Sequence, residues 1–188
     1  MTPPGLHGGH RVNLARVVPL AEEPEGYLEG APLCPMCLCL TDSAWISPDY
    51  RVVNRHDSVY TEGAALVVSE RFVEVVGGEA GCRFVPLPAD DGYHRLLVDH
   101  VLEVDRTIGE LELAGEPCPT CGRQSTYGDP AAFVGIDSAP RGFFRTDVEY
   151  GGIPRGRRSA QRSYIVVDDE LGRRLRDLRL CQIRPLQR

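Results

Sequence analysis

The sequence predicts an α+β fold in which two related strand–helix–strand halves share a mixed sheet. Residues 65–88 and residues 164–185 carry this prediction, because each contains an apolar run, a capping residue, a helical segment and a closing strand in the same order. An internal repeat of this kind predicts architecture more firmly than local propensity does. Equivalent positions keep one offset of 99 residues: Val67 with Val166, Cys82 with Cys181, and Pro86 with Pro185.

The first repeat opens with the apolar residues 65–68, which are typical of a buried strand. Ser69 is a favourable N-cap for a helix over residues 70–76, where two apolar side chains lie one turn apart on the face that packs inward. The glycine that follows at position 77 ends this helix, and residues 82–86 alternate as the closing strand.

The second repeat has the same order of signals. Residues 164–167 predict the strand, Asp168 predicts the helix cap, and residues 181–185 predict the closing strand. Between them, three leucines recur at i, i+4 and i+7 and predict one buried helical face. These leucines are Leu171, Leu175 and Leu178.

The remaining segments give weaker patterns. Residues 14–20 predict a short strand, and residues 45–53 predict one or two strands with a turn. Residues 93–104 alternate and predict a strand that leads toward the second half, whereas residues 151–163 lack an apolar period and predict a mobile basic loop. The chain is therefore predicted to be one domain over residues 1–188, with halves over 1–92 and 93–188.

Length and composition limit the classes of function. A chain of 188 residues with 42% hydrophobic residues can bury a core, and it contains no apolar run as long as a membrane span. The first residues do not resemble a signal peptide, which favours the reducing cytoplasm, where paired cysteines bind metal more often than they form disulfides. The net charge of −6 disfavours nucleic acid and suits a basic partner.

Two C-P-x-C knuckles are the strongest chemical signal in the chain. Cys34 and Cys37 form the first, and Cys118 and Cys121 form the second. Two knuckles supply four thiolates, which is the donor set of a closed structural Zn²⁺ site. We therefore expect a zinc site with four cysteine ligands that joins the two halves, and we expect no metal catalysis because four protein ligands leave no open position. Disulfides and free thiols remain the alternatives.

Neighbouring residues leave two details of this site open. A glycine after the second cysteine permits the tight turn of a knuckle, and Gly122 meets this need whereas Leu38 occupies the equivalent position in the first knuckle. Cys39 is a spare thiol that could replace Cys37 as a ligand. The other two cysteines, Cys82 and Cys181, lie in apolar strands and are expected to be small core residues.

With these residues in view, the sequence resembles a bacterial family known as the double-CxxCG-motif proteins. The resemblance rests on residues 118–123 (CPTCGR), on Gly142-Phe143-Phe144-Arg145, and on residues 165–170 (IVVDDE), and it covers the C-terminal half best. The first motif departs from the family pattern, since it reads CPMCL. Some members are immunity proteins of contact- or exchange-delivered toxin systems, so the resemblance implies a non-catalytic cytoplasmic protein that binds and neutralises a toxin.

The expected partner is a basic protein toxin, since charge complementarity gives fast and specific association. One candidate surface is formed by the variable loops expected around Asp147-Val148-Glu149-Tyr150. An acidic stretch is the other, and it comprises Asp99, Glu103, Asp105, Glu110, Glu112 and Glu116.

Two other functions remain open from the sequence. The first is a zinc-ribbon nucleic-acid-binding or regulatory module, with basic residues at Arg155, Arg157, Arg158 and Arg162. The second is an enzyme on a zinc-clipped scaffold. We expect no enzyme, because the sequence pairs no nucleophile with a base and contains no Gly-rich phosphate loop.

Overall fold

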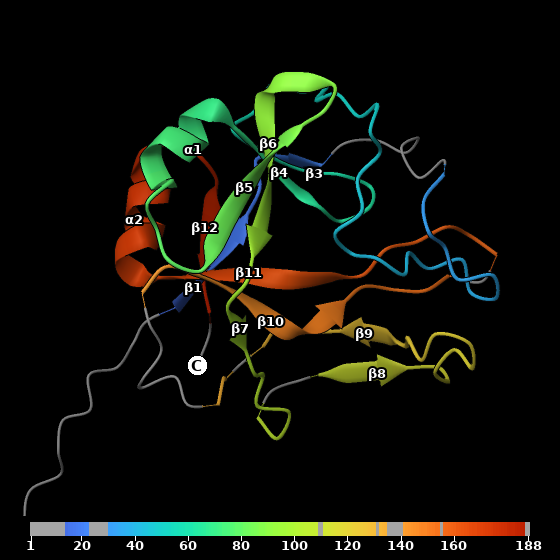
Figure 1. Cartoon of the computed structure of the whole chain (residues 1–188). Coiled ribbons are helices and arrows are strands. Elements are labelled where there is room, and N and C mark those ends of the chain that lie inside the picture. Colours follow the sequence, from blue (N-terminus) through green and yellow to red (C-terminus); the bar gives the residue numbers. More distant parts are fainter. Residues whose placement is uncertain are drawn as a thin grey trace, which may run out of the picture.

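The computed structural model describes residues 14–22, 30–108, 111–130, 132–134, 141–154 and 156–186. These residues form two helices, two five-stranded sheets and one two-stranded sheet, which confirms a mixed α+β fold (Figure 1). Glu110 and Arg155, which the sequence analysis named, lie outside the described residues. No helix in the described part of the chain is long and apolar enough to cross a membrane.

The first five-stranded sheet has the strand order β2-β3-β4-β6-β5. Its strands are antiparallel neighbours except for β2 and β3, which run parallel, so the sheet is mixed. Its members are β2 (Ala21–Glu22), β3 (Ser58–Tyr60), β4 (Leu66–Ser69), β5 (Cys82–Leu87) and β6 (Asp90–Val98), and α1 (Glu70–Val76) connects β4 to β5.

The second five-stranded sheet has the strand order β12-β1-β11-β10-β7. It too is mixed, since β7 and β10 run parallel and the other neighbours are antiparallel. Its members are β1 (Leu14–Val18), β7 (Val101–Leu102), β10 (Phe143–Tyr150), β11 (Arg162–Asp168) and β12 (Gln182–Pro185), and α2 (Asp169–Asp177) connects β11 to β12.

The prediction that both halves share one sheet is wrong. The unit β4–α1–β5 lies in one sheet and the unit β11–α2–β12 lies in the other, because the strands of each unit pair with different neighbours. In both units the two strands run parallel with one antiparallel strand between them, which is β6 in the first unit and β1 in the second. The predicted boundary at residue 92 falls inside β6, so it does not separate two elements.

The helix caps are confirmed. The Ser69 hydroxyl accepts a hydrogen bond from the Phe72 N–H at 3.2 Å, and the Asp168 carboxylate accepts from the N–H groups of Glu170 and Leu171 at 3.0 Å. The prediction that Leu178 belongs to the buried face of α2 is wrong, because the helix ends at Asp177 and Leu178 is exposed.

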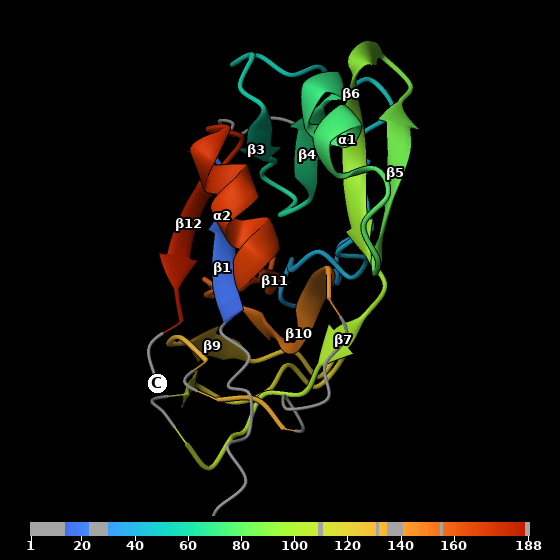
Figure 2. The same ribbon diagram turned by 90° about the vertical axis from the view of Figure 1, so that its left-hand side faces the viewer.

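The main core lies between the sheets and under both helices. Side chains from α1 and α2 belong to one apolar cluster, and the Phe72 ring lies 6.4 Å from the ring of Phe143 on β10. Figure 2 shows the two helices next to each other, with the strands of their own sheets beside them. The two sheets are thus held together by packing in this core, since no ladder of hydrogen bonds joins them within the described residues.

Two predicted segments differ from the structure in an informative way. Residues 45–53 form no strand, although Tyr50 and Val52 are buried, and the Val52 N–H donates to the Asp90 carboxylate at 3.1 Å. The strand predicted over residues 93–104 is interrupted after Val98, because the chain passes there from one sheet to the other and continues as β7.

Candidate metal centre

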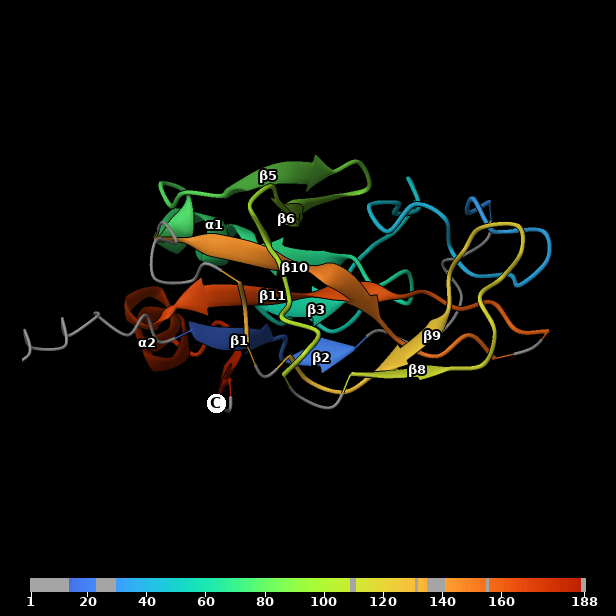
Figure 3. The same cartoon turned by 90° about the horizontal axis from the view of Figure 1, so that it is seen from below.

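The two knuckles are built in the same way. The second is the connection of the hairpin formed by β8 (Glu112–Ala114) and β9 (Ser125–Tyr127), and the first is closed by an antiparallel bridge between Leu33 and Leu40. Figure 3 shows the β8–β9 hairpin extending away from the two helices, so the knuckles lie at the opposite end of the molecule.

Backbone hydrogen bonds repeat from one knuckle to the other. In the first, Leu38 N–H donates to the Cys34 carbonyl at 2.9 Å, and in the second, Gly122 N–H donates to the Cys118 carbonyl at 2.8 Å. Leu38 has φ 58° and Gly122 has φ 72°, so both occupy the left-handed region. The first knuckle therefore adopts the same turn without a glycine, at a conformational cost of about 1–2 kcal/mol for the leucine.

The fold brings the four predicted ligands together. All four sulfur atoms lie within 4.8 Å of one another, with Cys34 Sγ 3.8 Å from Cys118 Sγ and Cys37 Sγ 3.6 Å from Cys121 Sγ. A tetrahedral ion with Zn–S bonds of about 2.3 Å places its sulfurs about 3.8 Å apart, so this donor set fits Zn²⁺. The thiols are all free, and these separations are far longer than a disulfide bond of about 2.05 Å.

Local electrostatics favour thiolates at two of the four positions. The backbone N–H groups of Cys37 and Met36 lower the pKa of the Cys34 thiol, and those of Cys121 and Thr120 lower the pKa of Cys118 to about 6. Burial raises the pKa of Cys37 to about 12. A bound cation would offset that burial, because it stabilises the thiolate directly.

The question of Cys39 is answered by its position. Cys39 is fully buried and lies outside the four-sulfur cluster, whereas Cys37 belongs to it. The backbone of Cys39 instead pairs with Ser159, and Ser159 N–H donates to the Leu38 carbonyl at 3.2 Å. The segment predicted as a mobile basic loop is therefore bound to the backbone of the first knuckle at Ser159.

Arg123 connects the second knuckle to its surroundings. Its guanidinium pairs with the Glu149 carboxylate on β10 at 3.0 Å and lies 3.4 Å from the Thr41 carbonyl, which follows the first knuckle. The sequence did not predict this contact or the one through Ser159. The arginine directly after the C-P-x-C-G motif is the only sequence signal for the contact with Glu149 and Thr41. Nothing in the sequence signals the pairing of Cys39 with Ser159.

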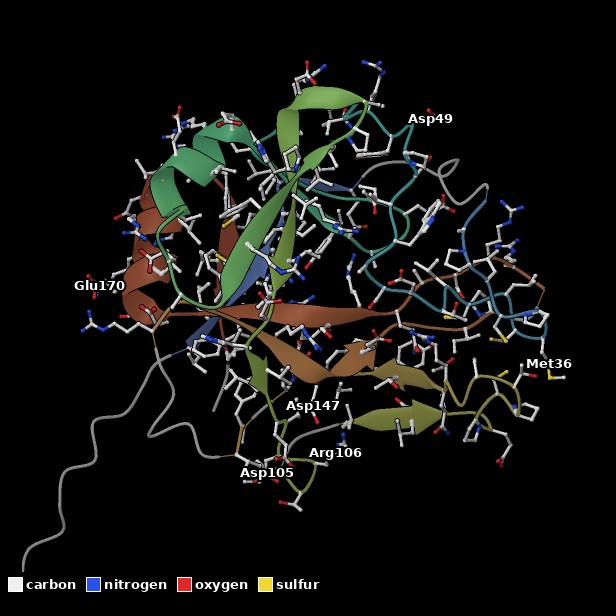
Figure 4. The ribbon with its side chains drawn as sticks, in the orientation of Figure 1. Met36, Asp49, Asp105, Arg106, Asp147 and Glu170 are labelled. Atoms are coloured by element: carbon white, nitrogen blue, oxygen red, sulfur yellow. The ribbon has the colours of Figure 1, made fainter. Side chains whose placement is uncertain are left out.

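Met36 lies at the exposed tip of the first knuckle, with 62% of its surface accessible. Its sulfur accepts a hydrogen bond from the Thr120 hydroxyl at 3.7 Å, so the tips of the two knuckles touch. Figure 4 shows Met36 at this end of the molecule, where the cysteine sulfurs gather. Cys34 and Cys118 are thus buried on the inner side of the cluster, and Met36 and Thr120 of the two knuckles border its outer side.

The predicted partner-binding residues are placed unequally. The prediction that Asp147–Tyr150 form a variable loop is wrong, because they lie in β10, where Tyr150 is buried and stacks on Tyr164 at 4.1 Å. Asp147 pairs with Arg106 at 3.0 Å, and Figure 4 shows these two side chains near Asp105 below the second sheet.

The acidic stretch keeps more exposed carboxylates. Asp99 pairs with Arg83 at 3.2 Å, and Asp105 accepts hydrogen bonds from Thr107 within its own turn. Three further carboxylates of the stretch are exposed, and they are those of Glu103, Glu112 and Glu116.

The basic residues of the alternative function do not form one uniform face. Arg157 and Arg158 are exposed. Arg162, in contrast, lies in β11, pairs with Glu22 at 3.0 Å and covers the Tyr60 ring at 4.3 Å. One of the described arginines of this set therefore already has an acidic partner within the chain.

A search with protein-family models finds no match to this chain, and a search of curated proteins finds no similar sequence. The geometry of the site therefore carries the argument about function.

Proposed function

We propose that this protein holds one structural Zn²⁺ through Cys34, Cys37, Cys118 and Cys121 and acts as a non-catalytic cytoplasmic immunity protein that neutralises a basic protein toxin. The observation that carries the proposal is the cluster of four sulfurs, contributed by two matched knuckles, because the second of these knuckles is also one of the motifs on which the resemblance to immunity proteins rests.

A structural role for the ion follows from its ligands. Four thiolates fill a tetrahedral shell and leave no position for a substrate or a water. The paired cysteines are 84 positions apart in sequence, so the ion would join two hairpins that the strands from β3 to β7 separate along the chain.

The partner is expected to bind the β7–β8 surface, which we define as residues 101–108 and 111–116 together with Val134. Exposed carboxylates of this surface alternate with exposed apolar side chains, and such a mixture suits a protein interface with a basic partner. The apolar members are Val101, Ile108, Leu113 and Val134, with exposed fractions of 48%, 54%, 58% and 52%. In Figure 1 the strands β7 and β8 lie on the same lower side of the molecule.

We also propose that the two sheets descend from one duplicated unit. The order β2-β3-β4-β6-β5 corresponds to β7-β10-β11-β1-β12 position by position, and each outermost pair, β2 with β3 and β7 with β10, is parallel. The two halves differ in the source of one strand, since β6 follows β5 directly whereas β1 comes from the other end of the chain.

The test combines metal analysis with partner binding. Native mass spectrometry of protein purified without added zinc should show one zinc per chain, and co-expression with the toxin encoded beside it should give a 1:1 complex and protect the cells. A Leu113→Arg variant should lose the complex and keep the zinc, because it removes an apolar contact and adds a charge that repels a basic partner. Glu74→Arg, on the exposed side of α1, also adds a positive charge and should keep both. Failure to bind or neutralise that toxin would overturn the immunity role.

The nucleic-acid alternative rests on Arg157 and Arg158, which are exposed. They directly precede Ser159, whose backbone pairs with Cys39 of the first knuckle. It predicts a mobility shift of DNA or RNA that weakens steeply with salt, because phosphate contacts release counterions. Absence of any shift at low salt would remove this alternative.

A further inference from the structure

A cleft of about 400 Å³ lies between the two five-stranded sheets, and neither the four cysteines of the metal cluster nor the residues of the β7–β8 surface line it. Its volume is in the range of small-molecule sites in proteins. Apolar side chains such as Leu66, Leu96 and Ile165 contribute to its walls. Four arginines from four different strands also line it, and they are Arg83 on β5, Arg95 on β6, Arg145 on β10 and Arg162 on β11.

A bulge in β10 borders this cleft. The pairing of β10 with β11 shifts register between Arg145 and Glu149, and both residues line the cleft. Bulges bend a strand and re-aim its side chains, and they are frequent beside functional sites. The bulge therefore lies at the part of β10 that lines the cleft together with arginines of both sheets.

The charges of the cleft are unbalanced. The lining contains four arginines and two carboxylates, Asp99 and Glu149. Both carboxylates are already engaged, since Asp99 pairs with Arg83, and Glu149 pairs with Arg123 outside the cleft. Because the whole chain has a net charge of −6, a cleft with an excess of two positive charges runs against the overall charge of the protein.

Two of these arginines have no acidic partner. Arg162 pairs with Glu22, but neither Arg95 nor Arg145 lies within 4.0 Å of any carboxylate in the described ranges of the chain. Arg95 donates one N–H to the Ala44 carbonyl, and Arg145 donates its Nε–H to the Val98 carbonyl at 3.2 Å. Each guanidinium has five N–H donors, so both keep donors for a further acceptor.

Arg95 gives the strongest reason to expect such an acceptor. Its side chain is half-buried, its Nε has no hydrogen-bond partner in the described structure, and burial lowers the pKa of this guanidinium. The charge of Asp42 offsets only part of this burial, because neither Asp42 nor any other described carboxylate lies within ion-pair distance of Arg95. An oxyanion would offset the rest, because its oxygens match the planar fork of a guanidinium.

We propose that this cleft binds a small oxyanion-bearing ligand, with a phosphate or carboxylate group held by Arg95 and Arg145. Arg83 and Arg162 contribute to the positive potential of the site while they remain paired with Asp99 and Glu22. The apolar walls would contact the body of the ligand. This site is independent of the proposed partner surface, since none of its lining residues belongs to that surface.

The experiment is calorimetric titration of the zinc-loaded full chain with two probes, inorganic phosphate and glutarate, each at constant ionic strength. At least one probe should bind saturably to the unmodified protein. Arg145→Gln should weaken that binding at least tenfold, because it removes a charge-assisted contact. Arg157→Gln, which removes an exposed arginine that does not line the cleft, should leave the affinity unchanged.

Each outcome decides the proposal. Binding of phosphate alone or of glutarate alone supports it and identifies the group that the cleft prefers. Lack of saturable binding of both probes at millimolar concentrations overturns it, and so does binding that Arg145→Gln and Arg157→Gln weaken equally. Arg95→Gln adds a second variant from the cleft, but the exposed Arg145 keeps the test valid if that variant does not fold.

Discussion

Replacement of Cys121 by serine is the most direct perturbation of the metal centre. It removes one of four thiolates and leaves the other three too few to close a tetrahedral shell. We therefore expect the variant to lose the ion, and with it the connection between Cys34 and Cys118 that spans 84 positions.

The size of the effect follows from this span. A cross-link that closes a loop of 84 positions restricts the unfolded chain by about 4–5 kcal/mol in the chain-entropy estimate. For a chain of 188 residues, each kcal/mol shifts the melting temperature by roughly 2–4 °C, so the expected decrease is roughly 10–20 °C. The main core does not include the knuckles, so the variant should still fold.

The assay is thermal unfolding followed by circular dichroism, together with zinc content measured by native mass spectrometry. Cys82→Ser is the matched control, because Cys82 is also a partly buried free thiol but lies outside the sulfur cluster. The control should keep one zinc per chain and lose at most a few degrees. An unchanged melting temperature and an unchanged zinc content in Cys121→Ser would refute the structural role of the cluster.

Three further predictions concern the fold. Asp168→Ala should lower the free energy of unfolding by about 2 kcal/mol in urea denaturation, because the carboxylate caps α2 and also accepts from the Gly142 N–H at 2.8 Å. A loss below about 1 kcal/mol, which the cap alone explains, would contradict the second role of Asp168. Gly142→Ala should lower the free energy of unfolding by more than about 3 kcal/mol, because φ is 113° and the new Cβ would lie 2.2 Å from the Ala80 carbonyl oxygen. A melting temperature within a degree of that of the unmodified protein would exclude this clash. Burial raises the pKa of Cys181 to about 12, against an ordinary value of 9.0, so this thiol stays neutral in the folded protein while an unfolded thiol ionises. The stability that the neutral, buried Cys181 thiol provides is therefore fully present below about pH 9. It is lost as the pH rises from 9 to 12. Cys181→Ala should flatten this part of the stability–pH curve, and an unaltered curve would show that another group causes the decrease.

Local signals predicted the two strand–helix–strand units well. Ser69 and Asp168 cap the helices as the sequence indicates, because a side-chain oxygen next to the first helical residue can satisfy backbone N–H groups without any distant partner. The same holds for the knuckles, whose spacing and prolines define a turn within a few residues. The structure brings their four sulfurs together at separations that match a tetrahedral ion.

Predictions that depended on distant partners were less accurate. An alternating pattern was interpreted as one strand over residues 93–104, although the chain changes sheets after Val98. Alternation reports which side chains face a core, and it does not report which strand lies alongside. Likewise, Tyr50 and Val52 are buried as the apolar pattern of residues 45–53 suggests, but their backbone joins no sheet.

The sequence by itself determined the units of this protein: the helices with their caps, the strands beside them, and the four cysteines with metal-ligand spacing. Only the tertiary structure decided how these units combine. It places β1 between β11 and β12, assigns the two units to separate sheets, and brings arginines from four strands to one cleft. The physical reason is that caps and knuckle turns are satisfied by atoms a few residues away. Strand pairing, burial and the potential of a cleft depend instead on groups that are far apart in the chain and meet only when it is folded.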